Sequence, residues 1–393
     1  MAIGALIGAY HEDDGGGLRA LLPLAGRTLL EYQARCASAA GAAPIVVVVE
    51  RVPQALQDAF ERLRLDGIGV FPISDVNEAV TRFEAGSTIL LIGDGIVPPI
   101  DLVINLAAEA DPVVAVVPDD EVHEEFARID GESRWAGVAI VVARLLGSTA
   151  AMLGDWDLQS TLLRRAIQEG ARRFRVGDGG NEPLIADSAE ELSNFQRHLV
   201  STSRGERDDA ASRFLLPWIE DRATEQLMQT QLRPAWLVWG ALALTLVSAV
   251  CFTRGWLGAG LVALVLSTPL DSIATRLATI RLKPLPARMI SRLALWPAAG
   301  LALCAVGLWE LRHGTGWGSL VAAGSACAFA EATRIERSGI PSDEPWLLSR
   351  RNVVFLAIPF ALAGVWTAFL LATLVYAVLS FYIVQRVVHR SAS

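Results

Sequence analysis

The sequence predicts an N-terminal α/β domain with a doubly wound, mainly parallel sheet, followed by an all-α membrane domain. Short apolar runs rich in β-branched residues alternate with helical segments over the first 200 residues, as in strands buried on both faces. From Pro234 onward the chain consists of apolar runs that approach the length of a membrane span. Hydrophobic residues make up 52% of the 393 residues, which favours a chain with a membrane part. We therefore expect a cytoplasmic domain at 1–200, a linker at 201–233 and a membrane domain at 234–390.

The strands of the α/β domain are expected at apolar runs bounded by loop or helix signals. These runs are 2–9, 44–50, 67–72, 87–93 and 112–118, with helices at 53–65 and 158–169. In sheets of this kind ligands bind beyond the carboxyl ends of the strands. Functional residues are therefore expected in the loops that follow the strands.

Two of these loops carry residues that suit a nucleotide. The loop after the first strand contains Gly15, Gly16 and Gly17, then Arg19, and Asp94 follows the strand at 87–93. Glycine loops cradle phosphates with backbone N–H groups, arginine binds phosphate and a carboxylate binds a divalent cation. Each feature also has a simpler alternative: a flexible turn for the glycines, a solvated position at a helix start for Arg19, and an ordinary turn acid for Asp94.

This domain resembles the nucleotidyltransferase fold of sugar-phosphate and polyol-phosphate cytidylyl- and uridylyltransferases, a Rossmann-like (GT-A) fold of the MobA-like NTP transferase type. The family pattern ends in P-V-x-G-R-P-L-L-E, and the matching residues here are Pro23, Gly26, Arg27, Leu29, Leu30 and Glu31. The resemblance implies that Arg19 contacts the nucleotide phosphates and that Asp94 binds the metal. Residues 135–138 and the helix at 158–169 resemble the half that binds the acceptor.

Asp187 begins a segment that resembles the late D-T-P-E-D-L segment of the same family, which makes it a further candidate metal ligand. An Asp with Glu190 three residues on also fits a helix N-cap, and this alternative stays open. The glycine loop departs from the family because three acids, Glu12, Asp13 and Asp14, precede it. Arginine at position 19 replaces the family's lysine, which keeps the charge but not the shape.

The linker at 201–233 is charged and then aromatic. We expect Trp218, Leu227 and Met228 to line one face of a helix that lies along the bilayer surface. Beyond it, six apolar spans are expected at 234–252, 256–270, 292–311, 316–333, 352–368 and 370–388. Arginine-rich loops at alternate ends of these spans predict a multi-pass protein of the inner (cytoplasmic) membrane with both termini in the cytoplasm.

An acid and a base, Asp271 and Arg276, lie at the inner end of the second span, where charges mark a site or an interface. The segment resembles the signature of CDP-alcohol phosphotransferases, D-x-x-D-G-x-x-A-R-x8-G-x3-D-x3-D, and implies that family's six-helix fold. Asp271 matches the second aspartate, a metal ligand, and Arg276 the arginine, so these are the candidate catalytic residues. Thr268, Met289 and Leu293 stand where the other three aspartates would be. Because one of four metal ligands survives, we expect that reaction to be lost.

A second acid–base pair, Glu331 and Arg334, lies near the inner end of the fourth span. Their i, i+3 spacing predicts a local pair. The alternative is that they line a polar cavity together with Asp271 and Arg276.

The two resemblances imply a membrane-bound transferase linked to phospholipid or polar head-group synthesis. It would use CTP or a CDP-alcohol with Mg²⁺ or Mn²⁺, in a homodimer. The alternative is a non-catalytic protein that keeps both folds as a scaffold, partner or lipid-binding regulator. A transporter is disfavoured because the chain has no repeated half. The net charge of −8 argues against a nucleic-acid partner, and the four cysteines lack metal-binding spacing.

Overall fold

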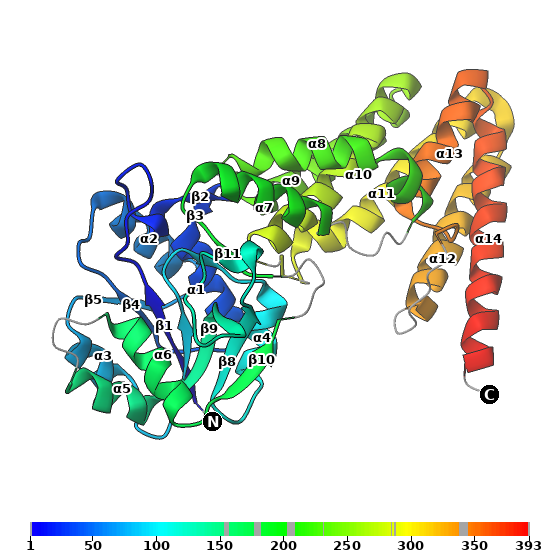
Figure 1. The fold of residues 1–393 in the computed structure, drawn as a ribbon. Helices are drawn as coiled ribbons and strands as arrows, with labels where there is room; N and C mark the ends of the chain where they lie inside the picture. The colour runs from blue at the N-terminus through cyan, green and yellow to red at the C-terminus, as the bar shows by residue number, and fades with distance from the viewer. Residues whose placement is uncertain are drawn as a thin grey trace. The chain divides into compact units, whose positions relative to one another are not determined.

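The computed structural model describes residues 2–152, 157–176, 182–202, 209–230, 232–283, 285–286, 288–337 and 345–391. The chain divides into two compact units, Met1–His198 and Leu199–Ser393. The first is the α/β unit and the second is helical (Figure 1).

A seven-stranded sheet forms the centre of the α/β unit, in the order β10-β8-β9-β6-β1-β4-β5. Its strands are β1 (Ile3–Gly8), β4 (Ile45–Val48), β5 (Val70–Ile73), β6 (Thr88–Ile92), β8 (Val113–Pro118), β9 (Ser133–Val142) and β10 (Arg172–Arg175). The strands pair in parallel, except that β9 is antiparallel to both of its neighbours, β6 and β8. The predicted α/β class is therefore confirmed, with a mixed sheet. The sequence analysis missed β9 and β10.

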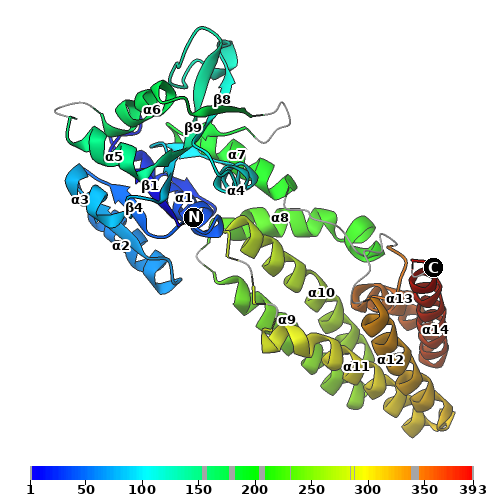
Figure 2. The same ribbon diagram turned by 90° about the horizontal axis from the view of Figure 1, so that it is seen from below.

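Helices cover both faces of this sheet (Figure 2). They are α1 (Leu29–Ala39), α2 (Gln54–Leu65), α3 (Val76–Arg82), α4 (Ile100–Ala107), α5 (Ala143–Ala150), α6 (Leu158–Gln168) and, at the end of the unit, α7 (Ala189–Thr202). Short segments connect them: η1 (Arg19–Leu21), β2 (Pro23–Leu24), β3 (Arg27–Thr28), β7 (Ile96–Val97), η2 (Glu121–His123) and β11 (Leu184–Ile185).

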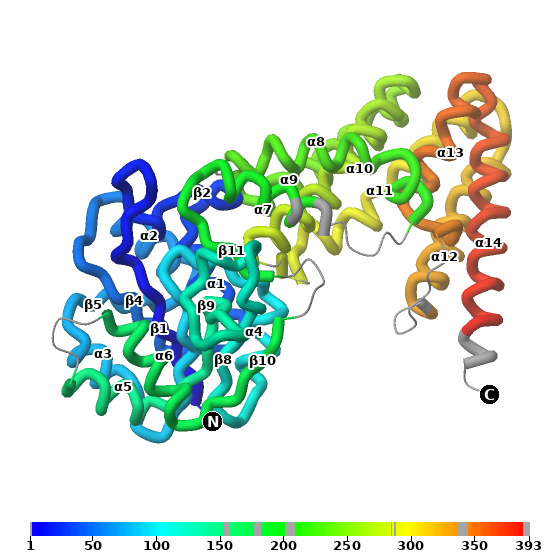
Figure 3. Tube along the Cα trace, viewed as in Figure 1, coloured from blue at the N-terminus to red at the C-terminus, as the bar shows by residue number. Residues whose placement is uncertain are grey.

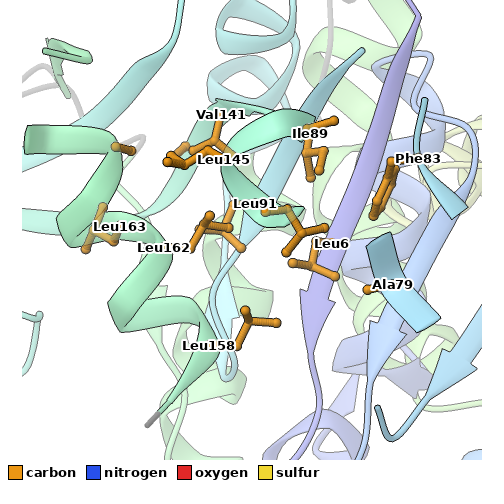
Figure 4. Close-up of a cluster of buried hydrophobic side chains, with 14 of the residues drawn as sticks. Leu6, Ala79, Phe83, Ile89, Leu91, Val141, Leu145, Leu158, Leu162 and Leu163 are labelled. Carbon is orange, nitrogen blue, oxygen red and sulfur yellow. The ribbon is translucent and has the colours of Figure 1, made fainter. Parts of the chain in front are cut away.

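One core lies between the sheet and the helices α3, α5 and α6. Strand residues such as Leu6, Leu91 and Val141 meet Leu158 and Leu162 of α6 in this cluster (Figure 4). All five side chains are buried. Burial of apolar surface on both faces of the sheet explains why the strands read as nearly continuous apolar runs. The packing also fixes α6, which carries residues that support the candidate site.

The start of α1 shows that Thr28 and Glu31 have a structural role. Thr28 is the N-cap, its hydroxyl accepts a hydrogen bond from Glu31 N, and the Glu31 carboxylate accepts one from Thr28 N.

Thr28→Ala should lower the free energy of unfolding by about 0.5–2 kcal/mol, because the helix loses its cap. Urea denaturation followed by circular dichroism measures this. Thr81→Ala, in an exposed part of α3, should stay within about 0.5 kcal/mol; equal effects of the two variants would contradict the capping role.

The second unit is a set of helices, traced in chain order from green to red in Figure 3. They are α8 (Pro217–Met228), α9 (Pro234–Thr253), α10 (Leu257–Ile280), α11 (Ile290–Glu310), α12 (Gly318–Arg337), α13 (Arg350–Ala363) and α14 (Trp366–Ser391), with π-helical turns η3 (Ala211–Leu215) and η4 (Leu311–Thr315).

Four helices of the described residues are long and apolar enough to cross a membrane, whereas six spans were predicted. The four spans are Pro234–Thr253, Leu257–Ile280, Ile290–Thr315 and Trp366–Val387. Helix α13 has 14 residues, and its length of roughly 21 Å is short of a hydrocarbon core of roughly 30 Å. Helix α12 ends in the charged residues Glu331, Arg334, Glu336 and Arg337. Helices are present at all six predicted spans. The prediction that all six have the length and composition of a membrane span is wrong for α12 and α13 among the described residues.

The predicted membrane face of α8 is wrong. Trp218 is 80% exposed, but Met228 is 2% exposed and packs inside the helical unit. Ten residues along an α-helix do not return to the same side, because successive residues are about 100° apart. Instead, the exposed apolar side chains around Trp218 are Phe214, Leu215 and Ile219, from η3 and the start of α8.

Candidate nucleotide site

The candidate site of the α/β unit forms where β1 and β6, neighbouring parallel strands, end at one edge of the sheet. Asp94 follows β6, and its Oδ2 accepts hydrogen bonds from the backbone of the loop after β1. The donors are Tyr10 N at 2.7 Å and His11 N at 2.6 Å, and His11 Nδ1 lies 3.3 Å from the same oxygen. The Asp94 carboxylate is therefore held in place by main-chain donors.

The second oxygen of this carboxylate has no partner among the described residues. The Asp94 side chain is 1% exposed, and its Oδ1 is buried without a hydrogen bond. A buried carboxylate oxygen without a partner costs free energy, and such groups occur where a ligand or ion completes them. Asp94 thus fits the role of a cation ligand.

Gln159 of α6 and its N-cap, Asp157, hold Asp94 and the loop after β1 in place through hydrogen bonds. The Gln159 side chain accepts a hydrogen bond from Asp94 N at 3.2 Å and donates one to Ile92 O at 3.0 Å. Asp157, the N-cap of α6, accepts a hydrogen bond from Tyr10 Oη at 2.6 Å. Gln159 and Asp157 were not predicted as part of the site, because nothing in their local pattern distinguishes them from ordinary helix-start residues.

A short antiparallel ladder brings the segment before Asp187 to the segment after Asp94. β11 pairs with β7, with Ile185 opposite Ile96, and Ala186 N donates to Gly95 O at 2.8 Å. Asp187 lies two residues after the end of β11, and Asp94 lies two residues before the start of β7, at the same end of this ladder. The N-cap alternative for Asp187 is wrong: Ser188 Oγ accepts the hydrogen bond from Glu191 N at the start of α7. The Asp187 carboxylate is therefore not used as a cap.

Arg19 completes this group. Its Nη2 lies 2.7 Å from Asp187 Oδ1, and both side chains are partly exposed. The Arg19 side chain passes over Gly95, where a Cβ atom would lie 2.9 Å from Arg19 Cδ. Gly95 also has a positive φ of 72°, so glycine suits this position for two reasons. The structure thus brings Arg19, Asp94 and Asp187 to one edge of the sheet.

The glycine loop is folded around one of its own acids. Asp13 Oδ1 accepts hydrogen bonds from Gly15 N at 2.9 Å and Gly17 N at 2.7 Å, and Asp13 O accepts one from Gly16 N. All three glycine N–H groups that the sequence offers for a phosphate therefore bind Asp13. The carboxylate occupies the position in the loop that a bound anion would take.

Two pKa values reflect this crowding of charge. The hydrogen bond to Asp94 raises the pKa of His11 above its usual value, although burial opposes it. Burial raises the pKa of Asp187, while the positive charge of Arg19 opposes the shift. Arg19 therefore faces Asp187, and the His11 imidazole faces Asp94.

In the helical unit, the two predicted catalytic residues, Asp271 and Arg276, form ion pairs with other side chains and not with each other. Asp271 binds two arginines from the start of α13: Arg350 Nη2 lies 2.9 Å from Oδ1 and Arg351 Nη2 lies 3.2 Å from Oδ2. Arg276 instead donates to Asp221 at 2.8 Å and to Val200 O at 3.0 Å. Asp271 and Arg276 are thus engaged by different partners. The contact of Arg350 and Arg351 with Asp271 was not predicted from the sequence.

In the described part of each unit, side chains alone do not form a metal centre. Across the residues that the structure describes, no group of three or more His, Cys, Asp or Glu side chains could hold a metal ion. Magnesium is often held by one or two carboxylates together with substrate phosphates, so Asp94 and Asp187 still fit it. Asp271 does not fit a metal ion, because two guanidinium groups already neutralise its oxygens.

Glu331 and Arg334 form the predicted local pair, with 3.6 Å between Glu331 Oε2 and Arg334 Nη1.

Residues 15–176 match the family model described as "MobA-like NTP transferase domain". Among solved structures, a putative glucose-1-phosphate thymidylyltransferase from Bacillus anthracis is 10% identical, with a TM-score of 0.40, over 50% of this chain and 94% of that chain. The CTP:phosphocholine cytidylyltransferase from Streptococcus pneumoniae is 15% identical, with a TM-score of 0.37, over 51% of this chain and 100% of that chain. The comparison with curated proteins found no match. The N-terminal unit is therefore nucleotidyltransferase-like, and a helical part with four candidate membrane helices follows it.

Proposed function

We propose that this chain is a membrane-associated nucleotidyltransferase that joins the nucleotidyl group of CTP to a phosphorylated alcohol. One observation carries the proposal: Arg19, Asp94 and Asp187 converge at the carboxyl edge of the sheet, inside or beside the region that matches the NTP transferase family. A nucleotide triphosphate requires a divalent cation, which the two carboxylates could hold, and a basic group such as Arg19. The fused helical unit supports activity at a membrane and a link to phospholipid or polar head-group synthesis.

In this reaction a phosphate oxygen of the acceptor attacks the α-phosphorus of the nucleotide, and pyrophosphate leaves. Arg19 would leave Asp187 and bind the phosphates, while Asp94 and Asp187 would hold Mg²⁺ or Mn²⁺. The ion, when bound, neutralises the phosphates and stabilises the leaving pyrophosphate. Gln159 and the Tyr10–His11 backbone keep Asp94 oriented. Tyr10 is in turn fixed through Asp157.

The helical unit is proposed to have lost the chemistry of CDP-alcohol phosphotransferases. Two metal ions require several carboxylates, and Asp271 offers one that two arginines already bind. Thr268 Oγ1 donates within its own helix, to Val265 O, and so offers no negative charge. In this proposal the helical unit serves as a membrane anchor and keeps the nucleotidyltransferase at the bilayer, where head-group synthesis would consume the CDP-alcohol.

A second candidate function is a non-catalytic scaffold or regulator, and the glycine loop favours it. Asp13 binds the amides that would hold a phosphate, and its charge repels a triphosphate. The two functions differ in whether nucleotide binds with Mg²⁺. Thermal unfolding of the full chain in detergent, with each of the four NTPs and Mg²⁺, tests this: stabilisation by CTP supports the transferase, and no shift with any nucleotide supports the scaffold.

Asp13→Ala should tighten CTP binding by roughly threefold to tenfold, because two charge-assisted hydrogen bonds no longer compete for the glycine amides. Isothermal titration of the full chain with CTP and Mg²⁺ measures the change. Glu12→Ala is the matched control, since Glu12 pairs with Arg51 and does not bind these amides. Weaker binding in Asp13→Ala would show instead that the carboxylate is needed to shape the loop.

A further inference from the structure

The helical unit contains a cavity of about 420 Å³ that the proposed nucleotidyl transfer does not use. This volume falls in the range of roughly 300–1,000 Å³ that is typical of small-molecule sites. Its walls come from α10 to α14, with Phe252 of α9, and most are apolar. Small side chains, such as Ala302, Ala326 and Ala330, leave the space open.

The polarity of the lining changes along the cavity. α11 begins and α12 ends at one end, where Glu331, Arg334 and Arg350 contribute charged groups. Phe252, Trp366 and Phe369 line the apolar part, and Trp366 contacts both phenylalanines edge to face. A ligand that matches this cavity therefore has a polar head and an apolar tail.

At the polar end of the cavity, Arg350 has N–H donors that could bind the polar head of a ligand. Its side chain is 8% exposed, and it makes one short contact, the 2.9 Å bond to Asp271. Its contacts with Thr245 and Ser267 are 3.3–3.5 Å long. A guanidinium carries five N–H donors, and no described residue accepts a hydrogen bond from Arg350 Nε. Arginine donors in this planar arrangement suit phosphate oxygens.

We propose that a membrane phospholipid occupies this cavity, with its phosphate at Arg350 and one acyl chain between the apolar walls. All four candidate membrane helices contribute residues to the lining, so the cavity would lie among lipids in a bilayer. Unfilled apolar space forfeits dispersion contacts, which an acyl chain restores. The charged lining of two arginines and one glutamate accepts both an anionic head and a zwitterionic head that carries an amine. The proposal does not depend on nucleotidyl transfer.

Quenching of tryptophan fluorescence by brominated lipids tests the proposal, because Trp296 and Trp366 both line the cavity. The full chain in detergent is titrated with brominated phosphatidylglycerol, phosphatidylethanolamine and a brominated fatty acid. We expect saturable quenching by both phospholipids, weaker quenching by the fatty acid, and loss of most of the signal in a Trp296→Phe, Trp366→Phe double variant. Absence of saturable quenching, or equal affinity for the fatty acid, would overturn the proposal.

Substitutions separate the head site from the tail site. Arg350→Gln should raise the apparent Kd for both phospholipids about tenfold or more, whereas Arg312→Gln, exposed and outside the cavity, should leave it unchanged. Ala330→Phe narrows the cavity and should also weaken binding. Ala332→Phe, on the same helix but outside the lining, is its control. Unchanged phospholipid affinity in both Arg350→Gln and Ala330→Phe would refute the lipid site.

Discussion

Replacing Asp94 with asparagine is expected to weaken Mn²⁺ binding in the presence of CTP by at least about a hundredfold, the scale of losing one preorganised electrostatic group. Asparagine keeps an oxygen that can accept hydrogen bonds from Tyr10 N and His11 N. Its amide group then replaces the unpartnered Oδ1 and presents N–H donors to the cation. The free Mn²⁺ signal in electron paramagnetic resonance measures the bound fraction directly.

Asp101→Asn provides the control, since this exposed carboxylate in the first turn of α4 lies on the same unit. It should bind Mn²⁺ as the unsubstituted chain does. The thermal unfolding temperature should be similar in both variants, because the contacts of Asp94 are kept. If Asp94→Asn bound Mn²⁺ and CTP normally, the unpartnered oxygen would not be a cation ligand.

Replacing Asp271 with alanine should destabilise the helical unit by about 3–5 kcal/mol, the cost of removing one partner of a buried ion pair. Arg350 and Arg351 are 8% and 16% exposed, and both would lose their contact with this carboxylate. Arg351 keeps Asp209, 3.2 Å away, whereas Arg350 keeps only the longer contacts with hydroxyl and carbonyl groups. Unfolding in detergent by increasing sodium dodecyl sulfate, followed by circular dichroism, measures the loss.

A comparison with Glu331→Ala makes this result specific. Glu331 and Arg334 are about half exposed, and exposed ion pairs contribute roughly 0–1 kcal/mol. The Asp271→Ala, Arg350→Met double variant should recover part of the lost stability, because the uncompensated charge is gone. A near-neutral Asp271→Ala would show that the carboxylate is solvated and free for another role.

The sequence predicted the sheet best where strands are fully buried. β1, β4, β6 and β8 are continuous apolar runs, and the burial of residues such as Leu6 and Leu91 on both faces explains that pattern. β10 was missed because its sequence, Arg-Arg-Phe-Arg, lacks such a run at the edge of the sheet. The span count failed at α13, whose apolar run in the sequence extends past Gly364, a residue in left-handed conformation that ends the helix.

The site could be predicted only in part, because its chemistry depends on contacts between distant residues. Arg19 and Asp94 were named from local motifs. The link from Gln159 to Asp94 joins residues 65 positions apart, and the link from Arg350 to Asp271 joins residues 79 apart. No local pattern reports such pairs. The choice of Ser188 over Asp187 as N-cap similarly depends on backbone geometry rather than residue type.

We propose above that the edge of the sheet with Arg19, Asp94 and Asp187 supports nucleotidyl transfer. The most direct measurement incubates the full chain in lipid vesicles with CTP, Mg²⁺ and a panel of phosphorylated alcohols, and detects products by mass spectrometry. We expect pyrophosphate and a CDP-alcohol in equal amounts, with both products abolished in Asp94→Asn and retained in Asp101→Asn. Formation of neither product with any acceptor, or equal turnover by Asp94→Asn, would contradict the proposal.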